Sequence, residues 1–276
     1  MQTLDLLPDQ IPAGWNRSSA AYDRDIWALM RPYVLDILLH ARPAKDARVL
    51  DVAAGSGAVT IRMAPHVGEV VAVDFADDML AQLRARAAYA ELSNVRTRVM
   101  DGQELDLDDE SFDLAVSNFG VIFFPDRVRG MAEMHRVLRP GGRGVITGWC
   151  AAERFELFRT FFDAVRAALP DLPAPPAPPP IFSLSDRDQF RTEMTDAGFA
   201  DVSMCTVRHS FEVASADAYW EMMSKSAPPA AVLLDRVGPE SAARIRTTLY
   251  EQIAARFGDG PFLLRNEAHL AVGHKD

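Results

Sequence analysis

The chain has 276 residues, of which 49% are hydrophobic and 25% are charged, proportions typical of a soluble globular protein. Its formal net charge of −10 argues against a nucleic-acid partner, because phosphate binding requires a basic surface. The N-terminal segment lacks the basic and apolar regions of a signal peptide, and no apolar run is long enough to span a membrane. We therefore expect a cytoplasmic protein with neither a nucleic-acid nor a membrane partner.

Residues 14–41 carry aromatic and aliphatic side chains at a spacing of three to four, which predicts one or two amphipathic helices. Pro32 is expected to break this segment or to occupy a first turn, because proline lacks the amide donor of a helix interior. The stretch 48–60 follows as a short apolar strand that ends in a turn containing Gly55 and Gly57. A helix begins after this turn, so the unit is a strand, a tight loop and a helix whose free amides point at the loop.

Four further apolar runs predict strands over 69–74, 95–100, 111–118 and 143–149. Helical patterns over 77–92 and 127–138 separate them, and the second helix is expected to stop at the Pro140-Gly141-Gly142 sequence. Strands that alternate with helices at this spacing predict a mainly parallel sheet with helices on both faces.

The second half of the chain has a different pattern. Helices are predicted over 153–169 and 185–197, with two or three more within 215–257, and strands over 202–213 and 267–274. Between the first two helices, residues 170–180 contain seven prolines, a composition that predicts an extended connector.

The residues that follow the parallel strands are the candidates for ligand binding, because ligands of open parallel sheets lie at the carboxyl ends of the strands. Asp74 ends the second strand, where a carboxylate can accept hydrogen bonds from both hydroxyls of a ribose. Two cofactor classes fit this outline, a nicotinamide dinucleotide and S-adenosylmethionine. The dinucleotide is disfavoured because Thr60 stands where its third glycine is expected and the loop has no basic residue for a pyrophosphate. Asp101 is instead placed to accept a hydrogen bond from an adenine amino group, with the Gly102 amide meeting a ring nitrogen.

Five motifs occur in order along the chain: Val49-Leu50-Asp51 through Gly57, Asp74 with Met79-Leu80, Asp101, Ser111-Phe112-Asp113, and Val137-Leu138-Arg139-Pro140-Gly141-Gly142. Together they resemble the class I S-adenosylmethionine-dependent methyltransferases, and most closely the branch that contains the ubiquinone and menaquinone biosynthesis methyltransferases. The resemblance is strong over residues 20–150 and looser at 196–199 and 255–258.

The resemblance implies an α/β fold with a doubly wound, mostly parallel seven-stranded sheet, a last strand that is antiparallel and inserted between its neighbours, and a helical cap. It implies one domain, residues 1–276. In this organisation residues 1–47 are a helical flap and 48–150 the cofactor-binding core. Residues 151–201 and 214–265 are cap helices, and residues 202–213 and 266–276 are the final strands.

The resemblance also implies a set of cofactor contacts. Gly55 and Gly57 pass close to the methionine moiety, Asp74 holds the ribose, Phe75 and Met79 flank the adenine, and Asn118 with Phe119 approaches the amino-acid part. Asp101 and Gly102 contact the adenine edge, and Tyr22 covers the cofactor. The complete set is Tyr22, Asp51, Ala53, Gly55, Gly57, Asp74, Phe75, Met79, Asp101, Gly102, Gln103, Asn118 and Phe119. Ala53 departs from the family, which usually has glycine there, and we expect a loop with slightly less room.

The function implied is methyl transfer from S-adenosylmethionine to O, N or C of a small-molecule acceptor, with S-adenosylhomocysteine as product. A nicotinamide-dependent oxidoreductase and a non-catalytic cofactor-binding module are the alternatives. No catalytic residue is assigned, because each of the candidate histidines, 135, 209, 269 and 274, has a structural explanation. No metal site is expected, since His, Cys, Asp and Glu show no metal-ligand spacing. The sequence leaves the acceptor and the oligomeric state open.

Overall fold

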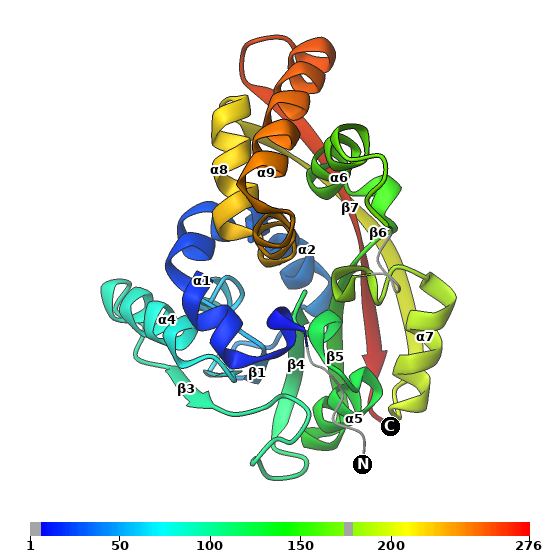
Figure 1. Ribbon diagram of the computed structural model, residues 1–276. Helices are drawn as coiled ribbons and strands as arrows, with labels where there is room; N and C mark the ends of the chain where they lie inside the picture. The colour runs from blue at the N-terminus through cyan, green and yellow to red at the C-terminus, as the bar shows by residue number, and fades with distance from the viewer. Residues whose placement is uncertain (1–6, 174–178) are drawn as a thin grey trace.

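A seven-stranded sheet forms the centre of the protein in the computed structural model, which describes residues 7–173 and 179–276 (Figure 1). The strand order is β3-β2-β1-β4-β5-β7-β6. The five strands of the first half pair in parallel, and β7 is antiparallel to both β5 and β6. The strands are β1 (Arg48–Val52), β2 (Glu69–Asp74), β3 (Val95–Val99), β4 (Phe112–Asn118), β5 (Leu138–Trp149), β6 (Ala200–Val213) and β7 (Phe262–His274). The predicted seven-stranded sheet with an inserted antiparallel last strand is confirmed.

Helices cover both faces of this sheet because its strands carry apolar side chains on both faces. In β1, Val49 packs in one apolar cluster while Leu50 and Val52 pack in another, following the alternation of a strand. Helices α2 (Trp27–Ala41), α3 (Thr60–Met63) and α4 (Asp77–Tyr89) cover the Val49 face, and α5 (Arg127–Val137) and α7 (Arg187–Asp196) cover the other.

The remaining helices gather at one end of the sheet. In Figure 1, α6 (Glu156–Ala168), α8 (Ala216–Ser226) and α9 (Pro228–Phe257) stand together beyond the carboxyl ends of the parallel strands, and α1 (Pro12–Asp25) lies beside them. Helix α9 is kinked at Gly238, whose φ of 79° and ψ of 170° are not helical and which precedes Pro239. Together these helices enclose the space above the strand ends.

The prediction for Pro32 was wrong. Pro32 lies inside α2, and the chain breaks earlier, at Ile26, between α1 and α2. The helix continues through the proline because its apolar face is buried against the sheet, with Tyr33, Val34 and Ile37 almost fully enclosed. The free energy of that burial outweighs the one backbone hydrogen bond that proline removes.

Strand β5 is longer than predicted. It begins at Leu138, immediately after α5, and the segment 139–142 passes through a register shift in its pairing with β4. Gly141 adopts a φ of 78°, and its amide donates to the carbonyl of Lys275 at 2.8 Å. The helix therefore ends just before this sequence, as predicted, and the glycines lie within an irregular part of β5. Of the predicted proline-rich connector 170–180, residues 174–178 lie outside the described residues.

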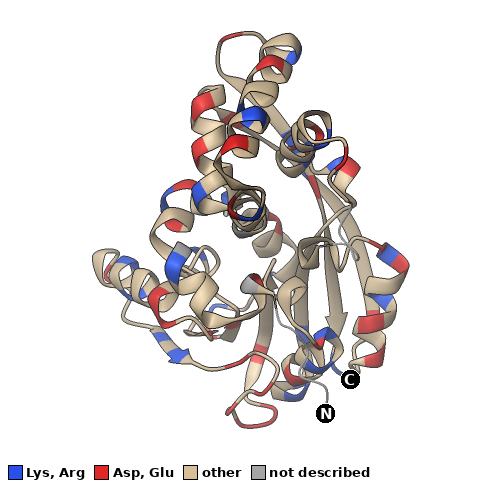
Figure 2. Ribbon diagram, viewed as in Figure 1, with Lys and Arg blue, Asp and Glu red and all other residues tan. Residues whose placement is uncertain are grey.

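Charged residues of both signs are interspersed along the outer helices in Figure 2, in a chain with a net charge of −10. In the described parts of the chain, no helix combines the length and the apolar character needed to cross a bilayer.

Candidate functional site

A cavity lies at the carboxyl ends of β1, β2 and β4, between the edge of the sheet and the helices above it. Twelve of the thirteen residues predicted as cofactor contacts line this cavity. The exception is Gly57, which is packed beneath helix α4. A β-carbon at position 57 would lie 2.6 Å from Cγ of Leu83, so this glycine is required for packing.

Three residues of the loop after β1 adopt a left-handed backbone conformation, and a hydrogen bond ties the loop to β2. Ala53, Gly55 and Gly57 have φ values of 55°, 56° and 91°. The amide of Gly55 donates to Oδ2 of Asp74 at 2.8 Å, which ties the loop to the end of β2. A β-carbon on Gly55 would meet no atom within 4 Å, so the backbone is open to the cavity at this residue. At Gly55 the main chain of the loop is therefore directly accessible to a ligand in the cavity.

Asp51 is buried beneath the loop, with 1% of its surface exposed. Its Oδ2 accepts hydrogen bonds from the amide of Thr60 at 3.1 Å and from the hydroxyl of Thr60 at 2.6 Å. Burial raises the pKa of Asp51 to about 7, although the two bonds from Thr60 act in the opposite direction. Thr60 therefore supplies two hydrogen bonds to the buried Asp51. The sequence pattern did not indicate this role, because it showed only that a threonine stands where a dinucleotide-binding loop has glycine.

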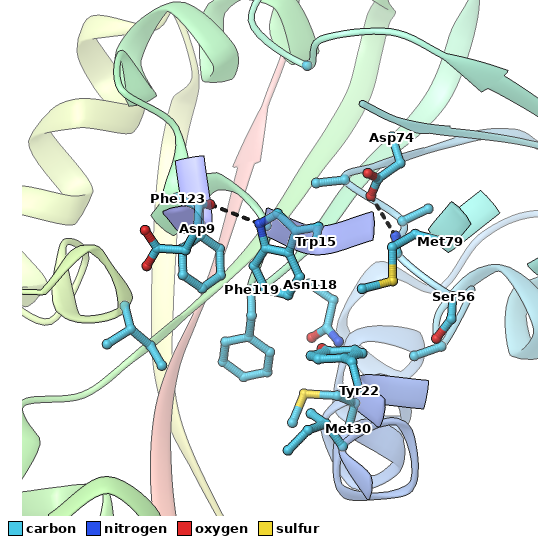
Figure 3. Close-up of a pocket in the computed structure, with 18 of the residues that line it drawn as sticks. Asp9, Trp15, Tyr22, Met30, Ser56, Asp74, Met79, Asn118, Phe119 and Phe123 are labelled. Atoms are coloured by element: carbon cyan, nitrogen blue, oxygen red, sulfur yellow. Dashed lines mark hydrogen bonds between the residues drawn. The ribbon is translucent and has the colours of Figure 1, made fainter. Parts of the chain in front are cut away.

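Asp74 is the second buried acid of the cavity. Its carboxylate accepts hydrogen bonds from the amides of Gly55 and Ala76, both at 2.8 Å, and burial raises its pKa to about 6. The side chain of Tyr22, on α1, lines the same cavity. Burial raises the pKa of Tyr22, and the negative charges of Asp74 and Asp23 raise it further. Asp74 and Met79 both line the cavity, and Figure 3 draws them on the same side of it.

The ends of β3 and β4 complete this side of the cavity. Oδ1 of Asp101 accepts hydrogen bonds from the amide and the side chain of Gln103, at 2.9 and 3.1 Å. Gly102 is enclosed, since a β-carbon there would lie 2.5 Å from Cζ of Phe124. Oδ1 of Asn118 accepts from the Thr147 hydroxyl at 3.0 Å, which fixes the orientation of the amide.

A row of stacked aromatic rings runs from the end of β4 into the cap. The ring of Phe119 stacks on Trp149 with centroids 3.9 Å apart, Trp149 on Phe155 at 4.2 Å, and Phe155 on Phe158 at 5.2 Å. All four line the cavity, and only Phe119 was predicted to do so. Trp149 ends β5, so the rule that identified the other strand ends points to it as well. Phe155 and Phe158 carry no comparable signal, since their position depends on how α6 docks.

Helix α1, the turn before it and the start of α2 contribute residues that line the cavity. Trp15 of α1 packs edge-to-face on Tyr22 and Phe123, with centroids 5.6 and 5.1 Å apart, and its indole nitrogen donates to the Asp9 carbonyl at 2.9 Å (Figure 3). Arg86 of α4 fastens the segment: its guanidinium pairs with Asp23 and donates to the carbonyl of Ser56 at 3.1 Å. The same guanidinium lies 4.4 Å from the centroid of the Trp27 ring. Helices α1 and α2 are thereby held against the loop that follows β1, residues 53–57, which we call the glycine loop.

The candidate histidines lie elsewhere in the protein. His135 packs edge-to-face on Phe199, His209 pairs with Asp36 at 2.5 Å, and Nε2 of His269 lies 3.5 Å from the Cys150 sulfur. None of the histidines in the described residues lines the cavity, and the same holds for lysine and arginine. Within residues 7–173 and 179–276, no group of three or more His, Cys, Asp or Glu side chains is arranged to hold a metal ion. The charged side chains of the cavity are the carboxyl groups of Asp9, Asp51, Asp74 and Asp101.

Comparison with known proteins gives consistent matches. A methyltransferase domain family matches residues 49–142. The chain is 29% identical to an uncharacterized protein of Mycobacterium tuberculosis, Rv1405c, over 90% of this chain and 93% of that protein. It is 32% identical to the ubiquinone/menaquinone biosynthesis C-methyltransferase UbiE of Geobacter sp. (strain M21), over 56% of this chain and 71% of that enzyme. A crystal structure of a putative methyltransferase from Bacillus halodurans superposes with a TM-score of 0.58 at 21% identity, covering 88% of this chain and 98% of that one.

Proposed function

The chain belongs to the class I S-adenosylmethionine-dependent methyltransferases, and we propose that it methylates an apolar small molecule held beside the cofactor in the cavity at the strand ends. S-adenosylmethionine is the cofactor, and when bound it supplies an electrophilic methyl group on a positively charged sulfonium. The observation that carries the proposal is the division of one cavity into two parts. Buried acids and bare backbone stand at the strand ends, and stacked aromatic rings stand beyond them.

The polar part of the cavity fits the proposed cofactor. The Ser56 hydroxyl is buried, lines the cavity and has no hydrogen-bond partner among the described residues. Such a group needs a ligand or a water molecule to satisfy it. Gly55 leaves open space where a side chain would stand, and Asp74 ends β2 with a carboxylate able to accept ribose hydroxyls.

We assign the cofactor contacts as follows. Asp74 holds the ribose, Phe75 and Met79 flank the adenine, and the loop with Asp101 binds its edge. Asn118 and the residues of the glycine loop contact the amino-acid part, while Tyr22 covers the cofactor from α1. The full set is the twelve predicted residues that line the cavity: Tyr22, Asp51, Ala53, Gly55, Asp74, Phe75, Met79, Asp101, Gly102, Gln103, Asn118 and Phe119.

We propose that the acceptor lies against the aromatic row and the apolar residues of the N-terminal flap and the cap. Trp149, Phe155 and Phe158 form a stacked row at the cavity, and Ile26 and Met30 of the flap also line it. Carboxyl groups line the cavity, and no lysine or arginine of the described residues does. This charge distribution disfavours an anionic acceptor. We propose that the chain contributes to the reaction by positioning the nucleophile in line with the methyl group and by excluding water.

The test is isothermal titration of the protein with S-adenosylmethionine, S-adenosylhomocysteine and NAD, followed by transfer of a labelled methyl group to a panel of apolar acceptors. We expect both sulfur nucleosides to bind and NAD not to bind. Asp74→Ala should weaken their binding by about 1–3 kcal/mol, because the ribose hydroxyls lose their acceptor. Asp106→Ala is the control, since it removes an exposed acid that pairs with Arg98 away from the cavity. Binding of NAD alone would support the oxidoreductase, and cofactor binding without transfer to any acceptor would support a non-catalytic module.

A further inference from the structure

A fourth acid of the cavity, Asp9, is not explained by the cofactor contacts. Asp9 lies in η1 (Pro8–Gln10), a short turn that packs against both α1 and α9. It lines the cavity, yet only 5% of its surface is exposed. Its carbonyl accepts the Trp15 indole N–H, so the turn is fixed to helix α1. The side chain is thus held at the cavity by a defined piece of structure.

The carboxylate of Asp9 has no partner among the described residues apart from its own backbone amide. Asp51 and Asp74, by contrast, each accept two hydrogen bonds from other residues of the chain. Burial raises the pKa of Asp9 above its ordinary value, and no cation among the described residues offsets this effect. A largely buried acid without a protein partner is costly unless water or a ligand at the cavity supplies a donor or a positive charge.

The surroundings of Asp9 favour a cation. In Figure 3 the carboxylate of Asp9 lies on the opposite side of the Trp15 indole from Asp74. The rings of Trp15 and Phe123 pack edge-to-face with centroids 5.1 Å apart and an interplanar angle of 70°, and both residues line the cavity with Asp9. Aromatic faces and a carboxylate together are a favourable environment for an ammonium group.

We propose that Asp9 binds an ammonium group of the methyl acceptor, so that the substrate is an apolar molecule that carries an amine. This assignment rests on the proposed methyltransferase function, because it places the amine in the acceptor part of the same cavity. Asp9 acts here as a binding and specificity residue. The apolar body of the acceptor lies along the aromatic row, and its charged end reaches the flap.

The experiment uses three probes of nearly equal size and different charge: naphthylmethylamine, naphthylmethanol and naphthoate. Each is titrated into the full chain saturated with S-adenosylhomocysteine, for the wild type, Asp9→Asn and Asp235→Asn. Asp235 is an exposed acid on α9 outside the cavity, so its variant controls for the loss of one negative charge. We expect the wild type and Asp235→Asn to bind the amine about tenfold more tightly than the alcohol, and naphthoate least tightly. In Asp9→Asn the preference for the amine over the alcohol should disappear.

Three results overturn the inference: equal binding of amine and alcohol by the wild type, a preference that survives in Asp9→Asn, or binding of S-adenosylhomocysteine without binding of any probe. Loss of S-adenosylhomocysteine binding in Asp9→Asn alone also overturns it, because Asp9 would then belong to the cofactor site. Failure of the wild type to bind S-adenosylhomocysteine is a different result, since it rejects the proposed function itself.

Discussion

The β-carbon of Ala53 occupies the space that a side chain at position 120 would need. A β-carbon built on Gly120 would lie 2.4 Å from Cβ of Ala53 and 2.9 Å from Oγ of Ser117. Ala53 itself has a φ of 55°, a left-handed conformation that favours glycine. The alanine at position 53 is therefore accommodated by a glycine in the loop after β4.

From this contact we predict that Ala53→Gly stabilises the protein by about 1 kcal/mol, because glycine relieves the left-handed strain. Gly120→Ala should destabilise it by about 1–3 kcal/mol through overpacking, and by less when Ala53→Gly is also present. Urea unfolding of the single and double variants measures both effects. Ala243→Gly, in the exposed face of α9, is the control and should instead lose about 1 kcal/mol. A double variant no better than the sum of its parts would show that the two positions are not coupled.

Thr60→Val should destabilise the fold by about 1–3 kcal/mol. The substitution keeps the shape of the side chain but leaves the buried Asp51 without the hydroxyl donor at 2.6 Å. Thr192→Val is the matched control, because the Thr192 hydroxyl bonds only to a carbonyl on the exposed side of α7. Chemical denaturation measures the free energy of unfolding of both variants. Equal decreases in this free energy would mean that the Asp51–Thr60 hydrogen bond contributes no more than an exposed one.

The free energy of unfolding of the cofactor-free protein should fall as the pH rises from about 4 to about 7 through the contributions of Asp51 and Asp74. Burial raises their pKa values to about 7 and about 6 from an ordinary 3.8, so the folded state binds more protons than the unfolded state in this window. Their contribution is fully present below the unfolded pKa and is lost as the pH passes the folded pKa. Asp51→Asn should flatten this part of the profile by an amount on the order of 1–3 kcal/mol. An identical profile in the variant would show that Asp51 titrates normally in the folded state.

Arg86→Met should accelerate release of S-adenosylhomocysteine by about tenfold, because it frees α1 from the glycine loop. The variant loses the pairing with Asp23 and the bond to the Ser56 carbonyl while keeping an apolar stem. Stopped-flow displacement measures the dissociation rate. Arg84→Met is the comparison, since Arg84 pairs with Asp77 on the same helix without touching the flap. If the two variants release the ligand at the same rate, Arg86 does not hold the flap closed.

The strand ends could be predicted because each combines two local signals, an apolar run and the polar residue that stops it. Asp74 and Asp101 were found in this way, and both line the cavity. The error at Pro32 arose because a local rule was applied to a helix whose stability comes from burial. The docking of the cap follows no short-range pattern, so the contribution of Phe155 and Phe158 required the three-dimensional structure.

Asp9 and Thr60 illustrate a second limit of prediction from the sequence. Their roles depend on which partner each side chain finds, and a sequence does not show partners distant along the chain. Thr60 satisfies Asp51 across a turn, and Asp9 is notable because no described residue does the same for it. Satisfaction of buried polar groups is a property of the folded structure.

The position of β7 between β5 and β6 has a consequence for the synthesis of the chain. Strand β6 contacts the sheet through β7, so β6 emerges from the ribosome before the strand it must pair with exists. The cap has the same dependence, because the buried Asn266 of β7 accepts the Leu157 amide of α6 at 3.0 Å and the Tyr33 hydroxyl of α2 at 3.1 Å. One late strand therefore joins the flap, the cap and the sheet. The parallel half can assemble during translation, while the acceptor side of the cavity closes only after β7 has been made.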